Sequence, residues 1–241
     1  MPDRTAAGAV HDRIGGMVRM RLMTYNIYLA GRRGAPLHEV VRSVAPDVLL
    51  VNESPHYPWV WRRQCRALAE QWRLRLVTGG RPAGSLMVLT RDGVKADVLR
   101  RKVLGRPPFR PRRGIVAAQL EVEGRPVGLV GCHLSLHPRQ RLREVGKVLT
   151  SAEGLRGPVV VAGDLNEPPG GPSWARLHAA GFVDHGDRGW LTFPAERPAK
   201  RIDAVLVRGD VAVHHHGDPG VAEELLARAS DHRPVLAVLD V

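Results

Sequence analysis

The stretch Pro158 to Glu167 reads PVVVAGDLNE. Its three consecutive valines form a short β-branched run, which is typical of a buried strand. Gly163 lets the backbone turn at the end of this run, and Asp164 and Asn166 follow two positions apart. Side chains two apart on an extended chain point to the same side. The stretch therefore predicts a strand that delivers a carboxylate and an amide together at the edge of a sheet.

The rest of the chain alternates between strand and helix patterns in both halves. Apolar alternation and β-branched runs predict strands, whereas apolar residues spaced three and four apart predict helices. Besides the valine-rich strand, the predicted strands are 19–29, 47–53, 74–78, 84–90, 94–103, 115–122, 126–134, 202–207, 211–215 and 235–241. The predicted helices are 37–44, 59–72, 138–152 and 173–180. The five strands between 74 and 134 are joined by short turns and look like a meander.

This order of elements predicts an α/β fold made of two packed sheets with helices outside. The 241 residues, of which 44% are hydrophobic, supply enough apolar side chains for one large core. The sequence contains no linker or low-complexity segment, so we expect a single domain over residues 19–241. Residues 1–18 are polar and without periodicity, and we expect a disordered lead there.

The sequence indicates a protein of the cytoplasm. No apolar run approaches the length of about 18 residues that a membrane-spanning helix needs. The N-terminal residues contain no apolar segment of the kind found in secretory signals. The two cysteines, Cys65 and Cys132, are too few for a disulfide framework and read as reduced, buried residues.

The charge balance favours a partner that carries phosphate. Lys and Arg number 36 against 24 Asp and Glu, which gives a formal net charge of +12. Such a charge is typical of proteins that bind nucleic acid or other polyanions. An arginine bias inherited from a GC-rich genome would produce the same balance, so the position of the charges is more informative than their sum.

Polar side chains gather where the predicted strands end. Each of them alone has an ordinary explanation, such as a turn cap or a core histidine that is hydrogen-bonded in place. Together they indicate a site, because ligand-binding and catalytic groups collect at strand ends in layered α/β proteins. The side chains in question are Asn26, Glu53, His133, Asp164, Asn166, Asp203, Asp231 and His232.

With its GDxN motif at Asp164 and its SDH motif at Ser230 to His232, this set resembles the endonuclease/exonuclease/phosphatase superfamily over about residues 19–241. That superfamily includes pancreatic-type deoxyribonucleases, abasic-site endonucleases, inositol polyphosphate 5-phosphatases and bacterial sphingomyelinases. The resemblance implies a four-layer α/β sandwich, in which two mixed β-sheets lie face to face between layers of helices. It also implies a phosphoester hydrolase that depends on Mg²⁺, for which Mn²⁺ can substitute.

The resemblance assigns three residues to the metal. Glu53 matches the principal metal ligand of the family, Asn26 lies beside it, and Asp231 is a further ligand, direct or through water. Few carboxylates plus waters are what Mg²⁺ prefers. The residue before Glu53 is Asn52, where the family commonly has glutamine, a departure that concerns a supporting amide only.

The resemblance assigns the remaining residues to catalysis by in-line attack of water on phosphate. His232 matches the histidine that contacts the scissile phosphate, and Asp203 matches the acid that hydrogen-bonds its ring. Asp164 would orient or deprotonate the water, with His232 as the alternative base, and Asn166 would hold the phosphate. His133 matches a second histidine, near the leaving group, which acts as a general acid in the nuclease branch.

A basic stretch is expected to select the substrate. Residues 100–113 read RRKVLGRPPFRPRR, with seven basic side chains and no acidic one. In the superfamily the corresponding hairpin borders the mouth of the active site. Arg112 and Arg113 would there hold phosphates, and Phe109 would stack on a base or sugar. A solvated, arginine-rich loop is the alternative.

Three functional hypotheses follow. The first is a phosphodiesterase that acts on nucleic acid, which the basic stretch and the net charge favour. The second is a phosphomonoesterase or a lipid-headgroup phosphodiesterase that uses the same site, which fits the compact chain. The third is a binding module without catalysis, against which the complete set of acids, amides and histidines argues.

Overall fold

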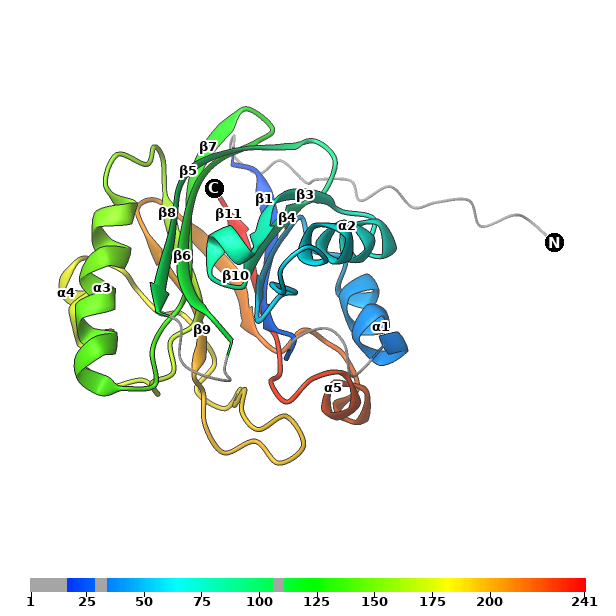
Figure 1. Cartoon of the computed structure of the whole chain (residues 1–241). Helices are drawn as coiled ribbons and strands as arrows, with labels where there is room; N and C mark the ends of the chain where they lie inside the picture. Colours follow the sequence, from blue (N-terminus) through cyan, green and yellow to red (C-terminus); the bar gives the residue numbers. More distant parts are fainter. Residues whose placement is uncertain (1–16, 29–33, 106–110) are drawn as a thin grey trace.

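The computed structural model describes residues 17–28, 34–105 and 111–241. In this part of the chain, two β-sheets pack face to face and helices cover both outer surfaces (Figure 1). The four layers are those that the sequence resemblance implied, so the predicted fold class is confirmed. No helix among the described residues is long and apolar enough to cross a membrane.

The first sheet has six strands and mixed directions. In spatial order they are β10 (Ala212–Gly217), β11 (Val235–Asp240), β1 (Arg19–Asn26), β2 (Val48–Asn52), β4 (Leu86–Thr90) and β3 (Arg75–Gly80). Strand β1 is parallel to β2 and antiparallel to β11. The helices on its outer surface are α1 (Gly34–Val44), α2 (Trp61–Gln71) and α5 (Glu223–Ala229) (Figure 1). A short 3₁₀ helix, η1 (Arg81–Ala83), precedes β4.

The second sheet has five strands in simple sequential order. They are β5 (Val94–Gly105), β6 (Arg113–Val122), β7 (Arg125–His133), β8 (Val159–Asp164) and β9 (Asp203–Arg208). The helices on its outer surface are α3 (Pro138–Ala152) and α4 (Pro172–Ala179) (Figure 1). Helix α3 is the crossover between β7 and β8, which are parallel.

The valine-rich run holds the layers together. Val160 belongs to the core between the sheets, whereas Val159 and Val161 belong to the core under α3 and α4. This alternation follows from the two-residue period of a strand that is covered on both faces. The same strand therefore needs an apolar side chain at every position, as the sequence pattern indicated.

The structure differs from the predicted meander. The strands between residues 74 and 134 divide between the sheets, because β3 and β4 join the first sheet and β5, β6 and β7 the second. Hydrophobic patterns show that strands follow one another, but they do not show at which turn the chain changes sheets. Helix α5 was also absent from the prediction, since its seven residues are too short for a clear period.

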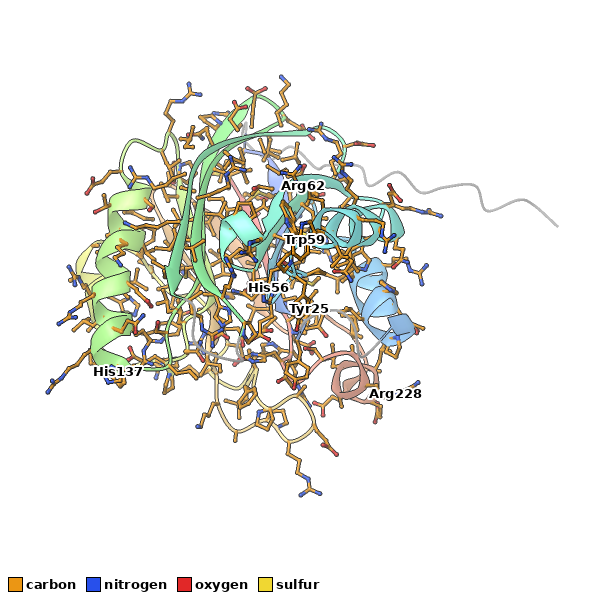
Figure 2. The ribbon with its side chains drawn as sticks, in the orientation of Figure 1. Tyr25, His56, Trp59, Arg62, His137 and Arg228 are labelled. Carbon is orange, nitrogen blue, oxygen red and sulfur yellow. The ribbon has the colours of Figure 1, made fainter. Side chains whose placement is uncertain are left out.

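The strand directions bring the polar candidate site residues to one edge of the two sheets. The register pairs Asn26 with Asn52, His133 with Asp164, and Asp164 with Asp203. Parallel strands end at the same edge, and antiparallel β9 and β11 begin there. This edge is the lower one in the view of the figures, where His137 marks the start of α3 (Figure 2). The predicted site residues therefore meet across both sheets.

Candidate active site

Asn26 and Glu53 lie together because β1 and β2 are parallel and in register. Asn26 ends β1, and Glu53 follows β2 with a backbone φ of 58°. The Asn26 Nδ2 lies 3.4 Å from Glu53 Oε1 and 3.1 Å from Asp164 Oδ2. One amide thus touches a carboxylate from each sheet. Positive φ is uncommon for a residue with a side chain and clusters at functional sites.

Glu53 has the environment of a metal ligand. Burial raises the pKa of its carboxyl to about 7, although Arg113 opposes the shift from 3.7 Å. Its Oε2 is buried and has no hydrogen-bond partner in the described part of the chain. A buried carboxylate oxygen without a partner is costly, and a divalent cation bound there would compensate it. The residues present therefore fit the metal that the resemblance implies.

Asp203 and His232 form the pair that the resemblance implied. The Asp203 Oδ2 accepts a hydrogen bond from His232 Nδ1 at 2.8 Å, and both residues are buried. Burial opposes the charged imidazole, but Asp203, Asp164 and Asp231 outweigh it and raise the pKa of His232 to about 10. Burial raises the pKa of Asp203 to about 6. Between these two values both members of the pair are ionised, so His232 is a cation at neutral pH.

His133 and Arg113 surround Asp164 on its other side. The His133 Nε2 lies 3.2 Å from Asp164 Oδ2, and Arg113 Nη1 lies 2.9 Å from His133 Nδ1. Burial and then Arg113 lower the pKa of His133 to about 4, so this imidazole is neutral. Burial alone would raise the pKa of Asp164, but His133, His232 and Arg113 hold it below its usual range. Asp164 is therefore a carboxylate next to a cationic and a neutral histidine.

Asn166 is held by its neighbours in the GDxN turn. Its backbone N–H donates to Asp164 Oδ1 at 2.9 Å, and its Nδ2 donates to the Leu134 carbonyl at 2.8 Å. Its φ of 52° lies in the left-handed region, where asparagine is more tolerant than most residues. Asn166 lines the cleft described below, so its side chain is within reach of a substrate.

Two of the predicted site residues, Asp231 and Arg112, are not among the described residues that line the cleft, and a third lies outside the described part of the chain. Asp231 is half-buried, its carboxylate accepts a hydrogen bond from Ser230 Oγ at 3.4 Å, and it is not among the described residues that line the cleft. Arg112 is half-buried, and its backbone N–H donates to Ser85 Oγ at 3.2 Å. Phe109 lies outside the described residues.

Arg113 differs from the expectation of a residue in an open basic loop. It begins β6, is buried, and lies against Glu53 and His133 at the bottom of the site. A substitution there would remove its contacts with Glu53 and His133. The partner of Arg113 across the sheet is Gly105, the last residue of β5.

A cleft of about 1030 Å³ opens over these residues. Glu53, Asp164 and His232 are among the residues that line it. The segment between α4 and β9, drawn in gold in Figure 1, supplies much of the remaining wall, including Phe193 and Lys200. The Phe193 ring packs against His232 with 4.8 Å between centroids. The cleft is therefore much larger than a phosphate group.

Exposed aromatic side chains follow Glu53 outside the cleft. Trp59 is 96% exposed, and His56 stacks on Tyr57 with ring centroids 5.1 Å apart. None of these is among the described residues that line the cleft, so we leave them out of the catalytic site.

The sequence did not predict a buried ion pair that lies beside the sheet edge where the candidate site residues gather. Arg141 of α3 donates from Nε and Nη2 to Glu167 Oε1, at 3.1 and 2.8 Å. Its Nη1 donates to the carbonyls of Ser135 and Leu136. One side chain thus fixes the loops that follow His133 and Asn166. The sequence does not distinguish Arg141 from the exposed arginines of the same helix, because its direction becomes clear only when the helix packs on the sheet.

Arg141→Met is expected to lower the free energy of unfolding by about 3 kcal/mol, because it leaves the Glu167 carboxylate buried without its cation. Urea denaturation followed by circular dichroism measures this change. Arg143→Met on the exposed face of the same helix is the control, and we expect it to stay within about 0.5 kcal/mol of the wild type. Equal stability of the two variants would show that the pair does not support the edge.

A family model identifies the family of this chain, and solved structures share its fold. The model of the Endonuclease/Exonuclease/phosphatase family matches residues 23–232. The chain belongs to this family. Its members are phosphoester hydrolases, so the predicted family and enzyme class are confirmed. A search of curated proteins found no match.

Structures of other family members share the fold at low sequence identity. An endonuclease/exonuclease/phosphatase protein from Bacteroides vulgatus is 19% identical, with 92% of this chain and 99% of that one covered and a TM-score of 0.74. The mannosyl-6-phosphatase Bt3783 of Bacteroides thetaiotaomicron is 17% identical, with coverages of 91% and 99% and a TM-score of 0.70. D. rerio TDP2, solved with a single-stranded DNA product, is 16% identical, with coverages of 92% and 99% and a TM-score of 0.67.

Proposed function

We propose that this family member hydrolyses phosphodiesters in a reaction that depends on Mg²⁺, and that its substrates are nucleic acids or their fragments. One observation carries the proposal. A carboxylate with an unpartnered oxygen (Glu53), an ionised carboxylate (Asp164) and an imidazolium (His232) face the same cleft. Hydrolysis of a phosphoester needs a metal ligand, a group that orients water and a cation for the phosphoryl oxygens.

Glu53 and Asn26 would hold the cation. When bound there, Mg²⁺ supplies positive charge that polarises the phosphoryl group, and Mn²⁺ can replace it. The ligand atoms of Asp164, Asp203 and His232 also lie within 4.8 Å of one another. We assign this group to phosphate and water instead, because a protonated imidazole whose Nδ1 donates to Asp203 has no lone pair for a metal. Asp231 would act on the cation through water.

The other residues act on water and phosphate. Asp164 would accept a hydrogen bond from the attacking water and take its proton. His232 would donate from Nε2 to a phosphoryl oxygen, a role that suits a cation better than that of a base. Asn166 would add a second donor, since one hydrogen of its amide remains beside the bond to Leu134. His133 is buried beneath Asp164 and absent from the described lining of the cleft, so we assign it to orienting Asp164.

The choice of a diester rests on the cleft. Its volume of about 1030 Å³ leaves room for substituents on the phosphate, and Arg113, Arg188, Lys200 and Arg201 line it. Cations around an extended groove favour a polyanion over a neutral alcohol. Among the similar structures, TDP2 is in complex with a single-stranded DNA product. The buried free thiols of Cys65 and Cys132 fit our assignment to the cytoplasm.

Hydrolysis of three substrates tests the proposal. We expect bis-p-nitrophenyl phosphate and single-stranded DNA to be cleaved in Mg²⁺, with a higher kcat/KM for the aryl diester than for p-nitrophenyl phosphate. EDTA should abolish each reaction. A preference for the monoester would instead support the second candidate, a phosphomonoesterase, which the similarity to a mannosyl-6-phosphatase favours. Binding of DNA without cleavage of any ester would indicate a module without catalysis.

A further inference from the structure

The cations of the cleft fall into two groups. Arg113 lies 3.7 Å from Glu53, and Arg201 forms a buried ion pair with Asp184 whose second contact, Nη1 to Oδ1, is 3.1 Å. These two guanidinium groups are neutralised by the protein. Lys200 and Arg188 are exposed, line the same cleft, and have no hydrogen bond or ion pair with another described side chain. Their charge is available to a ligand.

Lys200 is held close to the reacting centre by backbone geometry. It forms an isolated antiparallel bridge with Phe193, with N–H···O bonds of 2.9 and 2.8 Å in the two directions. Directly paired residues in such a bridge project their side chains to the same face, with Cβ atoms about 5 Å apart. The Phe193 ring in turn packs on His232 at 4.8 Å. Lys200 therefore stands one side chain away from the histidine that would contact the scissile phosphate.

We propose that Lys200, assisted by Arg188, binds a second phosphate of the substrate, one nucleotide away from the phosphate that is cleaved. The inference rests on the proposed function of the cleft and names the feature that its substrate must carry. The lysine is a flexible point charge with three donors, which suits a phosphate that approaches from solvent. The Phe193 ring between the two phosphate positions provides an apolar face for the sugar or base that joins them.

The observations favour a phosphate over other acidic groups. Phosphate offers several acceptor oxygens to an ammonium and a guanidinium together, and the proposed phosphate contact of His232 lies in the same cleft. A substrate with two phosphates would occupy both positions. A small aryl ester would occupy only the catalytic position and would not contact Lys200. Lys200 is thus expected to determine specificity without taking part in the bond cleavage.

Binding of two nucleotides tests this subsite. Calorimetry on the full chain in Mg²⁺ would compare deoxythymidine 3′,5′-bisphosphate with deoxythymidine 5′-monophosphate. We expect the wild type to bind the bisphosphate more tightly. Lys200→Gln should raise the Kd of the bisphosphate about tenfold, as expected for one lost charge-assisted hydrogen bond, and change that of the monophosphate less than about twofold. Arg188→Gln should act in the same direction.

Lys95→Gln is the matched control. It removes the same charge from an exposed lysine that pairs with Glu121 at 2.7 Å, at the start of β5. It should leave the preference for the bisphosphate unchanged. An unchanged preference in Lys200→Gln, an equal loss for both nucleotides, or no preference in the wild type would overturn the subsite. Binding needs no turnover, so a chain that prefers the bisphosphate but cleaves no ester would refute the proposed function and leave the subsite standing.

Discussion

Glu53→Gln is expected to reduce kcat/KM for bis-p-nitrophenyl phosphate by about 10³-fold, because the several kcal/mol that a bound metal contributes to the transition state are lost. The amide keeps the size of the side chain but loses the charge that holds Mg²⁺. Its environment would tolerate the change, since burial already disfavours the charged form and raises the pKa of Glu53 to about 7. We therefore expect the variant to be folded and at least as stable as the wild type.

Activity against Mg²⁺ concentration, with circular dichroism as the check on folding, measures this effect. The Mg²⁺ concentration for half-maximal activity should rise as well, because Asn26 alone is a weak ligand. Glu121→Gln, at a half-buried carboxylate of β6 that pairs with Lys95, is the control and should behave like the wild type. Activity that survives in EDTA would contradict the proposed dependence on a metal. An active Glu53→Gln variant with the Mg²⁺ dependence of the wild type would contradict it as well.

The sequence predicted the centre of the site because strand ends are visible in it. Asn26, Glu53 and Asp164 each end or directly follow an apolar run, and runs of this kind report burial and period together. The pairing of Asp203 with His232 came from resemblance to a family, since 29 residues separate them and no local pattern joins them. The structure brings Asp203 and His232 together because β9 and β11 run antiparallel to the strands that carry the other residues.

The remaining features depend on which way side chains point. Arg113 and Arg112 are neighbours in a basic run, yet only Arg113 is buried in the centre, because β6 begins at that residue. The sequence indicates that Arg141 lies on the surface of a helix, whereas the packing of α3 on the second sheet buries it. The bridge that brings Lys200 beside Phe193 belongs to an irregular segment in which no periodic pattern exists. Long-range packing decides each of these cases, and hydrophobic patterns in the sequence do not encode it.

Asp203→Asn and His232→Asn are each expected to lower kcat by about 10²-fold or more, the contribution typical of a positioned acid or phosphate-stabilising group. The two residues lie 2.8 Å apart and are both buried. Without the Asp203 carboxylate, burial and the remaining charges would leave His232 with a lower pKa, and its cation would no longer meet the phosphate. Without His232, the Asp203 carboxylate has no ring to hold and contributes nothing to the reaction.

The double variant Asp203→Asn with His232→Asn should therefore be little worse than the worse single variant, because residues that act as a unit are not additive. The removal of both members also avoids leaving one buried charge unpaired, so the double variant should be at least as stable as His232→Asn. Steady-state kinetics in saturating Mg²⁺, with urea denaturation of all three proteins, gives both quantities. Asp97→Asn, an exposed acid on β5, is the control for the loss of a carboxylate. Losses that multiply in the double variant would mean that Asp203 acts independently of the His232 ring.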